Sequence, residues 1–94
     1  MSWQVSFKKH AAKQVAKLPN NIAKATRALV HEIGLLGPLR YNWKNFGKIK
    51  GTETFYHCHI KDGNPTYVAC WEVIDKKIKI VEVYYVGTHE KAPY

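Results

Sequence analysis

A strict alternation of apolar and basic side chains runs through Phe55-Tyr56-His57-Cys58-His59-Ile60-Lys61. Because successive residues of a β-strand point to opposite faces, this pattern predicts a strand with two chemically different faces. The apolar face carries Tyr56, Cys58 and Ile60. The basic face carries His57, His59 and Lys61, with about 7 Å between successive side chains. Such a row is unusual for a purely structural strand, so the rest of the chain is interpreted around it.

The sequence of the C-terminal half predicts two further strands beside this one. Turn-forming residues at 62–65 and 75–77 divide it into strands over 54–61, 66–74 and 78–86. Connections this short require antiparallel neighbours. The apolar pattern predicts a core face that also contains Val68, Cys70, Ile74, Val81, Val83 and Tyr85. The opposite face would then present Tyr67, Ala69, Trp71, Glu82 and Tyr84 beside the histidines.

The N-terminal half predicts one strand and two helices. Residues 3–7 alternate as a short strand, and apolar residues at helical spacing over 10–18 and 22–36 predict two helices on either side of Pro19. A break this short predicts an antiparallel helical hairpin that lies across the sheet. We therefore expect one small α+β domain, residues 1–94, with the order β-α-α-β-β-β and a mainly antiparallel sheet.

The composition points to an anionic partner. The 94 residues carry a formal net charge of +8, which indicates a polyanion or an acidic protein, although a merely well-hydrated basic surface has the same composition. Aromatic residues make up 13% of the chain and several lie among the lysines, which favours nucleic acid over a membrane surface. With no secretion signal or membrane-spanning segment recognised, we expect a cytoplasmic protein with reduced, buried cysteines.

A basic and aromatic segment, residues 39–51, precedes the first strand of the predicted meander. Its basic residues are Arg40, Lys44, Lys48 and Lys50, interleaved with three aromatic residues. We interpret the segment as a loop that leads into a strand. Trp43 and Phe46 are explained equally well as plugs at the edge of the core and as part of a surface that binds nucleic acid.

Three histidines are candidates for proton transfer: His57, His59 and His89. Imidazole exchanges protons near neutral pH, which suits RNA cleavage without a metal. In that reaction the ribose 2′-hydroxyl attacks the adjacent phosphate. One group removes a proton, another protonates the leaving oxygen, and a cation holds the phosphate. The spacing leaves open which histidine is the base and which the acid, and no cofactor is expected.

Two other interpretations of these histidines stay open from the residues alone. A strand can hold two histidines as a half-buried pair that is hydrogen-bonded to its neighbours. A zinc ion could bind His57 and His59 together with His89 or Glu82, because zinc accepts nitrogen and oxygen ligands. We favour acid–base chemistry over metal binding, since the surrounding lysines would repel a divalent cation.

Short motifs along the chain occur in the order found in a known family. They are Ala16-Lys17-Leu18-Pro19, Lys48-Ile49-Lys50-Gly51, Tyr67 to Val73 followed by Ile74-Asp75, and Val86-Gly87-Thr88-His89-Glu90. Over nearly the whole chain, these motifs and the order of elements resemble the RelE/ParE superfamily of bacterial toxins. The resemblance implies a ribosome-dependent mRNA endoribonuclease, a type II toxin held inactive by a cognate antitoxin. It also implies contact with operon DNA only through the toxin–antitoxin complex.

The resemblance also implies roles for individual residues. His57 and His59 correspond to basic residues on the first meander strand, and His89 corresponds to the residue that follows the last strand. Tyr94 corresponds to a tyrosine that stacks on or positions the substrate, and Trp71 is a second candidate for stacking. Phosphate contacts would fall to lysines, for which the candidates are Lys48, Lys50, Lys61 and Lys91.

The arginines depart from the family pattern. Many RelE-like nucleases carry arginines in the second meander strand and the tail, whereas this chain has only Arg27 and Arg40. A lysine is a poorer clamp for phosphate than a forked guanidinium. A histidine-centred variant, as in HigB-like toxins, would account for the difference. The alternatives are a ParE-like inhibitor of DNA gyrase and a non-catalytic binding member of the same fold.

Overall fold

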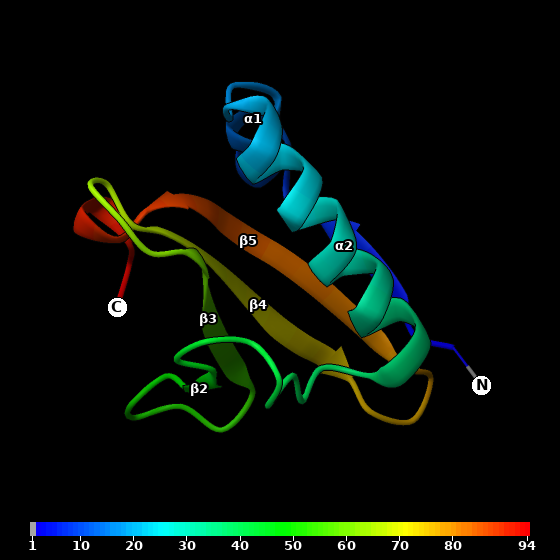
Figure 1. The fold of residues 1–94 in the computed structure, drawn as a ribbon. Helices are drawn as coiled ribbons and strands as arrows, with labels where there is room; N and C mark the ends of the chain where they lie inside the picture. Colours follow the sequence, from blue (N-terminus) through cyan, green and yellow to red (C-terminus); the bar gives the residue numbers. More distant parts are fainter. Residues whose placement is uncertain (1) are drawn as a thin grey trace.

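The computed structural model describes residues 2–94 as two helices packed on one five-stranded sheet (Figure 1). The elements are β1 (Gln4–Phe7), α1 (Lys9–Ala16), α2 (Asn20–Leu36), β2 (Gly47–Lys48), β3 (Phe55–Lys61), β4 (Tyr67–Asp75), β5 (Ile80–Thr88) and the 3₁₀-helix η1 (His89–Lys91). This order confirms the predicted α+β fold. The sequence did not predict β2, which is only two residues long and is defined by its pairing with β3.

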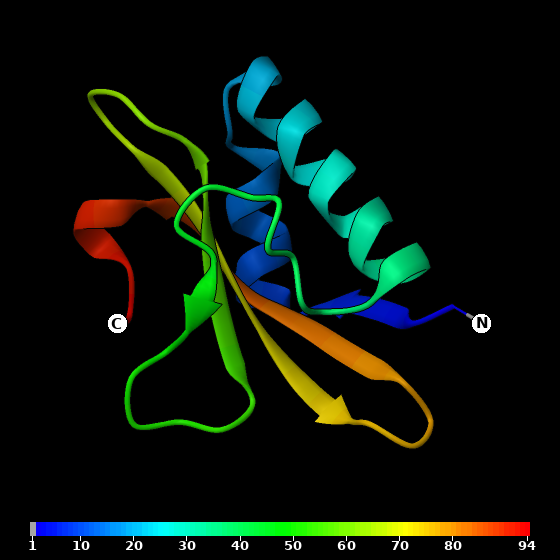
Figure 2. The ribbon, with the colours of Figure 1, turned by 60° about the horizontal axis from the view of Figure 1, so that its bottom comes forward.

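The sheet is mainly antiparallel, as predicted. Its strands lie in the order β1-β5-β4-β3-β2, and only the β1–β5 pair is parallel. Both helices lie on the same side of the sheet and run in opposite directions (Figure 2). Neither of these helices is long and apolar enough to cross a membrane. The C-terminal tail packs on the other face of β3 and β4.

Helix α2 is anchored by one buried face. Its buried residues, at most 2% exposed, recur at helical spacing and are Ile22, Thr26, Leu29 and Ile33. The helix starts directly after Pro19 and stops before Gly37, whose φ of 100° favours glycine. Leu36, which ends the apolar pattern predicted over 22–36, is 67% exposed at the last position of the helix.

The register of β3 and β4 corrects the predicted sheet faces. Tyr56 lies opposite Trp71 and Cys58 lies opposite Ala69, and residues directly opposite one another share a face. Cys58, Ala69 and Trp71 all belong to the core beneath the helices. Trp71 is 0% exposed, and its Nε1 donates a hydrogen bond to Pro38 O at 3.2 Å. The placement of Ala69 and Trp71 beside the histidines is therefore wrong, and Trp71 is no stacking platform on that face.

Strand β4 is buried on both faces, so its sequence has no polar side that would indicate which face meets the helices. Val68, Cys70 and Tyr85 form a second cluster on the histidine face, which we call the Cys70 cluster. Cys70 lies opposite Tyr85 while Trp71 lies opposite Val83, so a bulge in β5 shifts the alternation by one residue. The prediction that these three residues face the helices is therefore wrong, for Val68 and Cys70 because both faces of β4 are apolar and for Tyr85 because of the bulge.

The two cysteines consequently lie on opposite faces of the sheet instead of together on the core face. Cys58 packs beneath the helices and Cys70 packs in its own cluster. Both are free thiols. Burial raises the pKa of each thiol to about 12, so both are protonated near pH 7 and serve as small apolar side chains.

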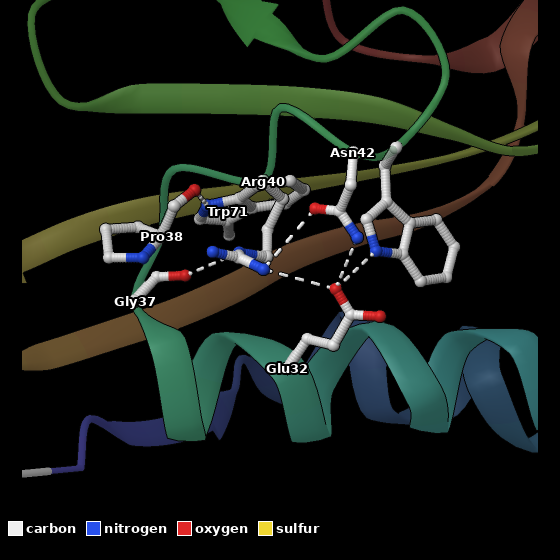
Figure 3. A network of polar contacts seen from close by, with 7 residues as sticks. Glu32, Gly37, Pro38, Arg40, Asn42 and Trp71 are labelled. Carbon is white, nitrogen blue, oxygen red and sulfur yellow. Dashed lines mark hydrogen bonds and ion pairs between the residues drawn. The ribbon is translucent and has the colours of Figure 1, made fainter.

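A polar network ties the loop after α2 to the helix (Figure 3). Glu32 Oε1 accepts hydrogen bonds from three side chains, those of Arg40, Asn42 and Trp43, at 3.2, 2.9 and 2.9 Å. Arg40 Nε also donates to Gly37 O at 3.0 Å. Arg40 is therefore occupied inside the protein, and Trp43 packs against the core as one of its two interpretations predicted. The network fixes the path of the loop that continues to Lys44.

Candidate active site

The C-terminal tail folds back onto the sheet face opposite the helices. The His89 N–H donates to Thr66 O at 2.8 Å, which ties the start of η1 to the connection between β3 and β4. Ala92 packs against the Cys70 cluster. These two contacts bring His89 and Tyr94 beside β3 from a distant part of the sequence.

Four rings meet where the tail crosses β3, and we call them the histidine cluster: His57, His59, His89 and Tyr94. The rings of His57 and Tyr94 are stacked, with centroids 4.3 Å apart and an interplanar angle of 28°. His89 meets Tyr94 edge to face at 5.9 Å and His59 edge to face at 5.5 Å. The structure thus brings together the three histidines and the tyrosine that the sequence singled out.

His57 is an electrically neutral member of this cluster near pH 7. Burial lowers its pKa below the ordinary value of 6.5, and the neighbouring His59 and His89 lower it further. Its Nδ1 is buried and finds no hydrogen-bond partner among residues 2–94. The atom is therefore available to hydrogen-bond a ligand that enters the cluster.

The lowered pKa of His57 predicts a pH dependence of stability. In the unfolded chain the pKa returns towards 6.5, so below that pH the unfolded state binds more protons than the folded state. His57 therefore contributes stability above pH 6.5 that is lost as the pH falls through its folded pKa. Urea unfolding at a series of pH values between about 8 and about 5 measures this loss. His57→Gln is expected to flatten the profile, and an unaltered profile would contradict the assignment.

Tyr94 is a neutral phenol in this site. Burial is the main cause that raises its pKa to about 12, so the hydroxyl cannot act as a base near pH 7. The residue is 43% exposed although its ring stacks on His57. It can therefore stack on a nucleobase or donate a hydrogen bond, but it does not remove a proton.

His59 makes a second set of polar contacts. Its Nδ1 lies 2.6 Å from Asp62 Oδ1, and Asp62 Oδ2 forms an ion pair with Lys44 Nζ. The backbone N–H of His59 donates to Lys44 O at 2.8 Å. The hydrogen bond from Lys44, followed by the one from His59, lowers the pKa of Asp62, so this carboxylate is ionised near pH 7.

Sequence reasoning missed Asp62 and Lys44 as site residues. The sequence marks Asp62 as a turn residue and Lys44 as one of several basic residues in the loop. In a regular strand, residues three apart point to opposite faces, so the spacing of His59 and Asp62 predicts no contact. The contact forms because β3 becomes irregular after His59 and ends at Lys61. In the sequence, the only signal for this contact is a histidine followed three residues later by an acidic turn residue.

The same irregularity separates Lys61 from the histidine row. The pairing moves directly from His59 opposite Val68 to Lys61 opposite Tyr67, which leaves Ile60 unpaired. Lys61 lines a hollow on the side of the helices. The prediction of a continuous row of two histidines and Lys61 on one face is therefore wrong.

The other lysines expected to contact phosphate are exposed at separate places on the surface. Lys48 is opposite Tyr56, so it is directed towards the helix face, and its Nζ lies 3.8 Å from a Glu53 carboxylate oxygen. Lys50 is exposed in the turn after β2. Lys91 is exposed in η1 and lines a shallow hollow. Lys44 is instead the lysine that approaches the histidine cluster, through Asp62.

The alternative zinc site is not assembled in this structure. Among residues 2–94 no group of three or more histidine, cysteine, aspartate or glutamate side chains is placed to hold a metal ion. Glu82, the fourth residue of that alternative, lies opposite Glu72, and its carboxylate is 3.9 Å from Lys8 Nζ.

The order of elements, the mixed sheet and the two helices on one face define a RelE-type toxin fold. An arginine double mutant of the Escherichia coli toxin RelE in its free state superposes with a TM-score of 0.76 at 23% identity, over 98% of this chain and 88% of that one. The YoeB dimer of Staphylococcus aureus gives a TM-score of 0.73 at 15% identity, over 95% and 99% of the two chains.

A third similar structure is a toxin–antitoxin complex. The RelBE2 complex of Mycobacterium tuberculosis has a TM-score of 0.70 at 18% identity, over 95% of this chain and 100% of that one. No protein-family model and no curated protein sequence gives a significant match to this chain. The fold predicted from the short motifs is thereby confirmed by structure.

Proposed function

We propose that this protein is the toxin of a type II toxin–antitoxin system and a metal-independent endoribonuclease that cleaves mRNA on the ribosome. The observation that carries the proposal is the histidine cluster, where three imidazoles and a phenol share one face of a chain with a net charge of +8. The RelE-type toxin fold supports the same conclusion.

The cluster contains the groups that cleavage through the 2′-hydroxyl requires. One imidazole with a free lone pair removes the hydroxyl proton, and the oxygen attacks the adjacent phosphorus. A second, protonated imidazole gives its proton to the 5′-oxygen as the P–O bond breaks. The products are a 2′,3′-cyclic phosphate and a 5′-hydroxyl end. His59 and His89, with ring centroids 5.5 Å apart, are close enough to act on one phosphodiester.

Substrate binding is assigned to the tyrosine and the surrounding lysines. Tyr94 presents an aromatic surface beside His57, and stacking of a base on such a surface contributes about 1–3 kcal/mol. The exposed positive charges attract the phosphate backbone as point charges. In this proposal they are Lys44, Lys50 and Lys91, whereas Lys48 and Lys61 are directed towards the helix side of the sheet.

An apolar cleft on the helix side supports the proposed antitoxin partner. The cleft has a volume of about 420 Å³ and is lined by Trp3, Leu36, Gly37, Pro38, Leu39, Tyr56, Val73 and Lys76. Leu36 and Leu39 are exposed, and the chain is basic, so a segment with apolar and acidic side chains complements it. Similar structures include the E. coli RelBE toxin–antitoxin complex. We assign contact with operon DNA to the antitoxin complex and the site of action to the cytoplasm.

A cell-free translation reaction tests the proposed activity. The purified chain is added to a bacterial system, and new mRNA 5′ ends are mapped at nucleotide resolution. Cleavage within translated codons is expected for the native chain and is lost in the triple variant with alanine at His57, His59 and His89. The matched control replaces His10 and His31, which are exposed on the helices, and keeps full activity. A chelator that binds zinc but leaves the Mg²⁺ of the ribosomes in place tests independence of a zinc ion in a parallel reaction, and retained cleavage is expected.

The opposite result would select an alternative function. Intact mRNA with the native chain, combined with inhibition of DNA gyrase supercoiling, would support the ParE-like function and overturn the nuclease. Intact mRNA without gyrase inhibition or growth arrest would leave a non-catalytic binding protein. Equal cleavage by the native chain and the triple variant would place the active site away from the histidine cluster.

A further inference from the structure

We propose that Asp62 is a positioning residue that holds His59 in the tautomer of a general base, with Lys44 holding Asp62 in turn. The inference rests on the proposed nuclease function and deepens it, because it assigns the base that the sequence leaves open. It is carried by three contacts: His59 Nδ1 to Asp62 Oδ1 at 2.6 Å, Asp62 to Lys44 Nζ, and His59 N to Lys44 O at 2.8 Å.

The hydrogen bond to Asp62 decides which nitrogen of His59 is free. An ionised carboxylate can only accept a hydrogen bond, so Nδ1 must carry the hydrogen that lies between the two residues. In the neutral ring, Nε2 then has a free lone pair, which is the form that a general base needs. His59 is thereby prepared to remove a proton before any substrate binds.

The geometry around Asp62 is held from two sides. The side chain of His59 is only 16% exposed, so its ring is confined on the sheet face. Lys44 accepts from the backbone of His59 and pairs with the carboxylate of Asp62, which links the loop and the strand at two points. The loop itself is fixed to α2 by the Glu32 network (Figure 3). The carboxylate is therefore positioned by the fold as well as by its own turn.

The remaining members of the cluster fit the other roles. After His59 accepts the 2′-hydroxyl proton at Nε2, the ring is an imidazolium whose charge Asp62 stabilises. His89 is exposed, its ring is 5.5 Å from His59, and its protonated form gives a proton to the 5′-oxygen. His57 lies against Tyr94 as a neutral ring. The charged and titratable groups that face His59 are Asp62, Lys44, His57 and His89.

Nuclear magnetic resonance tests the tautomer without any need for activity. Chemical shifts of the ¹⁵N-labelled histidine rings are assigned with a His59→Gln variant and recorded above pH 7. The native chain is expected to show His59 with hydrogen on Nδ1, and Asp62→Ala is expected to move the population towards the Nε2–H form. The matched control, Asp75→Asn, lies at the far end of β4 and keeps its contacts to Lys77 N and Ile78 N. A native His59 with hydrogen on Nε2 would overturn the proposal.

Cleavage kinetics provide the functional readout. Hydrogen-bond partners that orient histidines at metal sites contribute about ten- to hundredfold to activity. We expect a loss of the same order in the single-turnover rate of Asp62→Ala, because Asp62 makes the same kind of contact with His59. A native rate in Asp62→Ala would overturn the base assignment. An inactive native chain with the Nδ1–H tautomer would overturn the nuclease function instead, while the positioning by Asp62 would stand.

Discussion

Replacing His59 by alanine is expected to lower the rate of mRNA cleavage by about 10²- to 10⁴-fold, the range that a general base or acid contributes. His59 combines the hydrogen bond to Asp62 with a ring 5.5 Å from His89. His89→Ala should cause a loss of similar size. Because base and acid act in one step, the double variant should be little slower than either single variant.

Single-turnover measurements on a synthetic message bound to ribosomes separate chemistry from binding. His31→Ala is the matched control, since His31 is exposed on α2, away from the cluster. If His59→Ala cleaves at the native rate while His57→Ala does not, the base is His57 and the roles within the cluster must be exchanged. Circular dichroism of each variant establishes that the fold is intact before rates are compared.

Trp71→Ala is expected to destabilise the protein by about 3–5 kcal/mol, the cost of removing a large aromatic side chain from a packed core. Trp71 is 0% exposed, stacks against Phe46 with centroids 6.0 Å apart, and donates a hydrogen bond to Pro38 O. The total stability of a small domain is only about 5–15 kcal/mol, so this variant is expected to be partly unfolded at 37 °C.

Urea unfolding of native and variant chains measures the loss. Trp71→Phe keeps the aromatic stack but loses the hydrogen bond to Pro38, so it should cost less than Trp71→Ala. Tyr41→Ala serves as the control, because Tyr41 is 78% exposed and contacts Phe46 only at its edge, a contribution of about 0.5–1.5 kcal/mol. A stable Trp71→Ala chain that binds RNA poorly would return Trp71 to the substrate face.

The elements of the fold could be predicted because each has a local cause. Pro19 separates two helical patterns, and the turn residues at 62–65 separate two strands. The alternation from Phe55 to His59 corresponds to a real strand with two distinct faces. Strand β2 could not be predicted in the same way, since two residues carry no periodicity and acquire their conformation from pairing with β3.

The sheet faces could be predicted only where one side of a strand is polar. In β3 the histidines mark one side, whereas β4 is apolar on both and gives no such mark. The bulge at Tyr84 and Tyr85 then places Tyr85 on the side opposite to the one that simple alternation predicts. Bulges depend on how two neighbouring strands pair, so the sequence of either strand alone does not predict them.

The candidate site likewise contains residues that could be predicted from the sequence and contacts that could not. Residue chemistry and motif order singled out His57, His59, His89 and Tyr94, and the structure brings these four rings together. The contacts of Asp62 and Lys44 with His59 were beyond prediction. They require a strand to end irregularly and a loop from the other half of the chain to arrive at the same point.

For this protein, local sequence patterns were enough to predict the order of the two helices and the longer strands and to single out the four rings that meet in the histidine cluster. These properties depend on neighbouring residues and on side-chain chemistry, which the sequence contains directly. Tertiary structure alone decided that Trp71 is core, that the tail folds back beside β3, and that Asp62 is hydrogen-bonded to His59. Those outcomes depend on packing between segments distant in sequence, and only the folded chain brings such segments together.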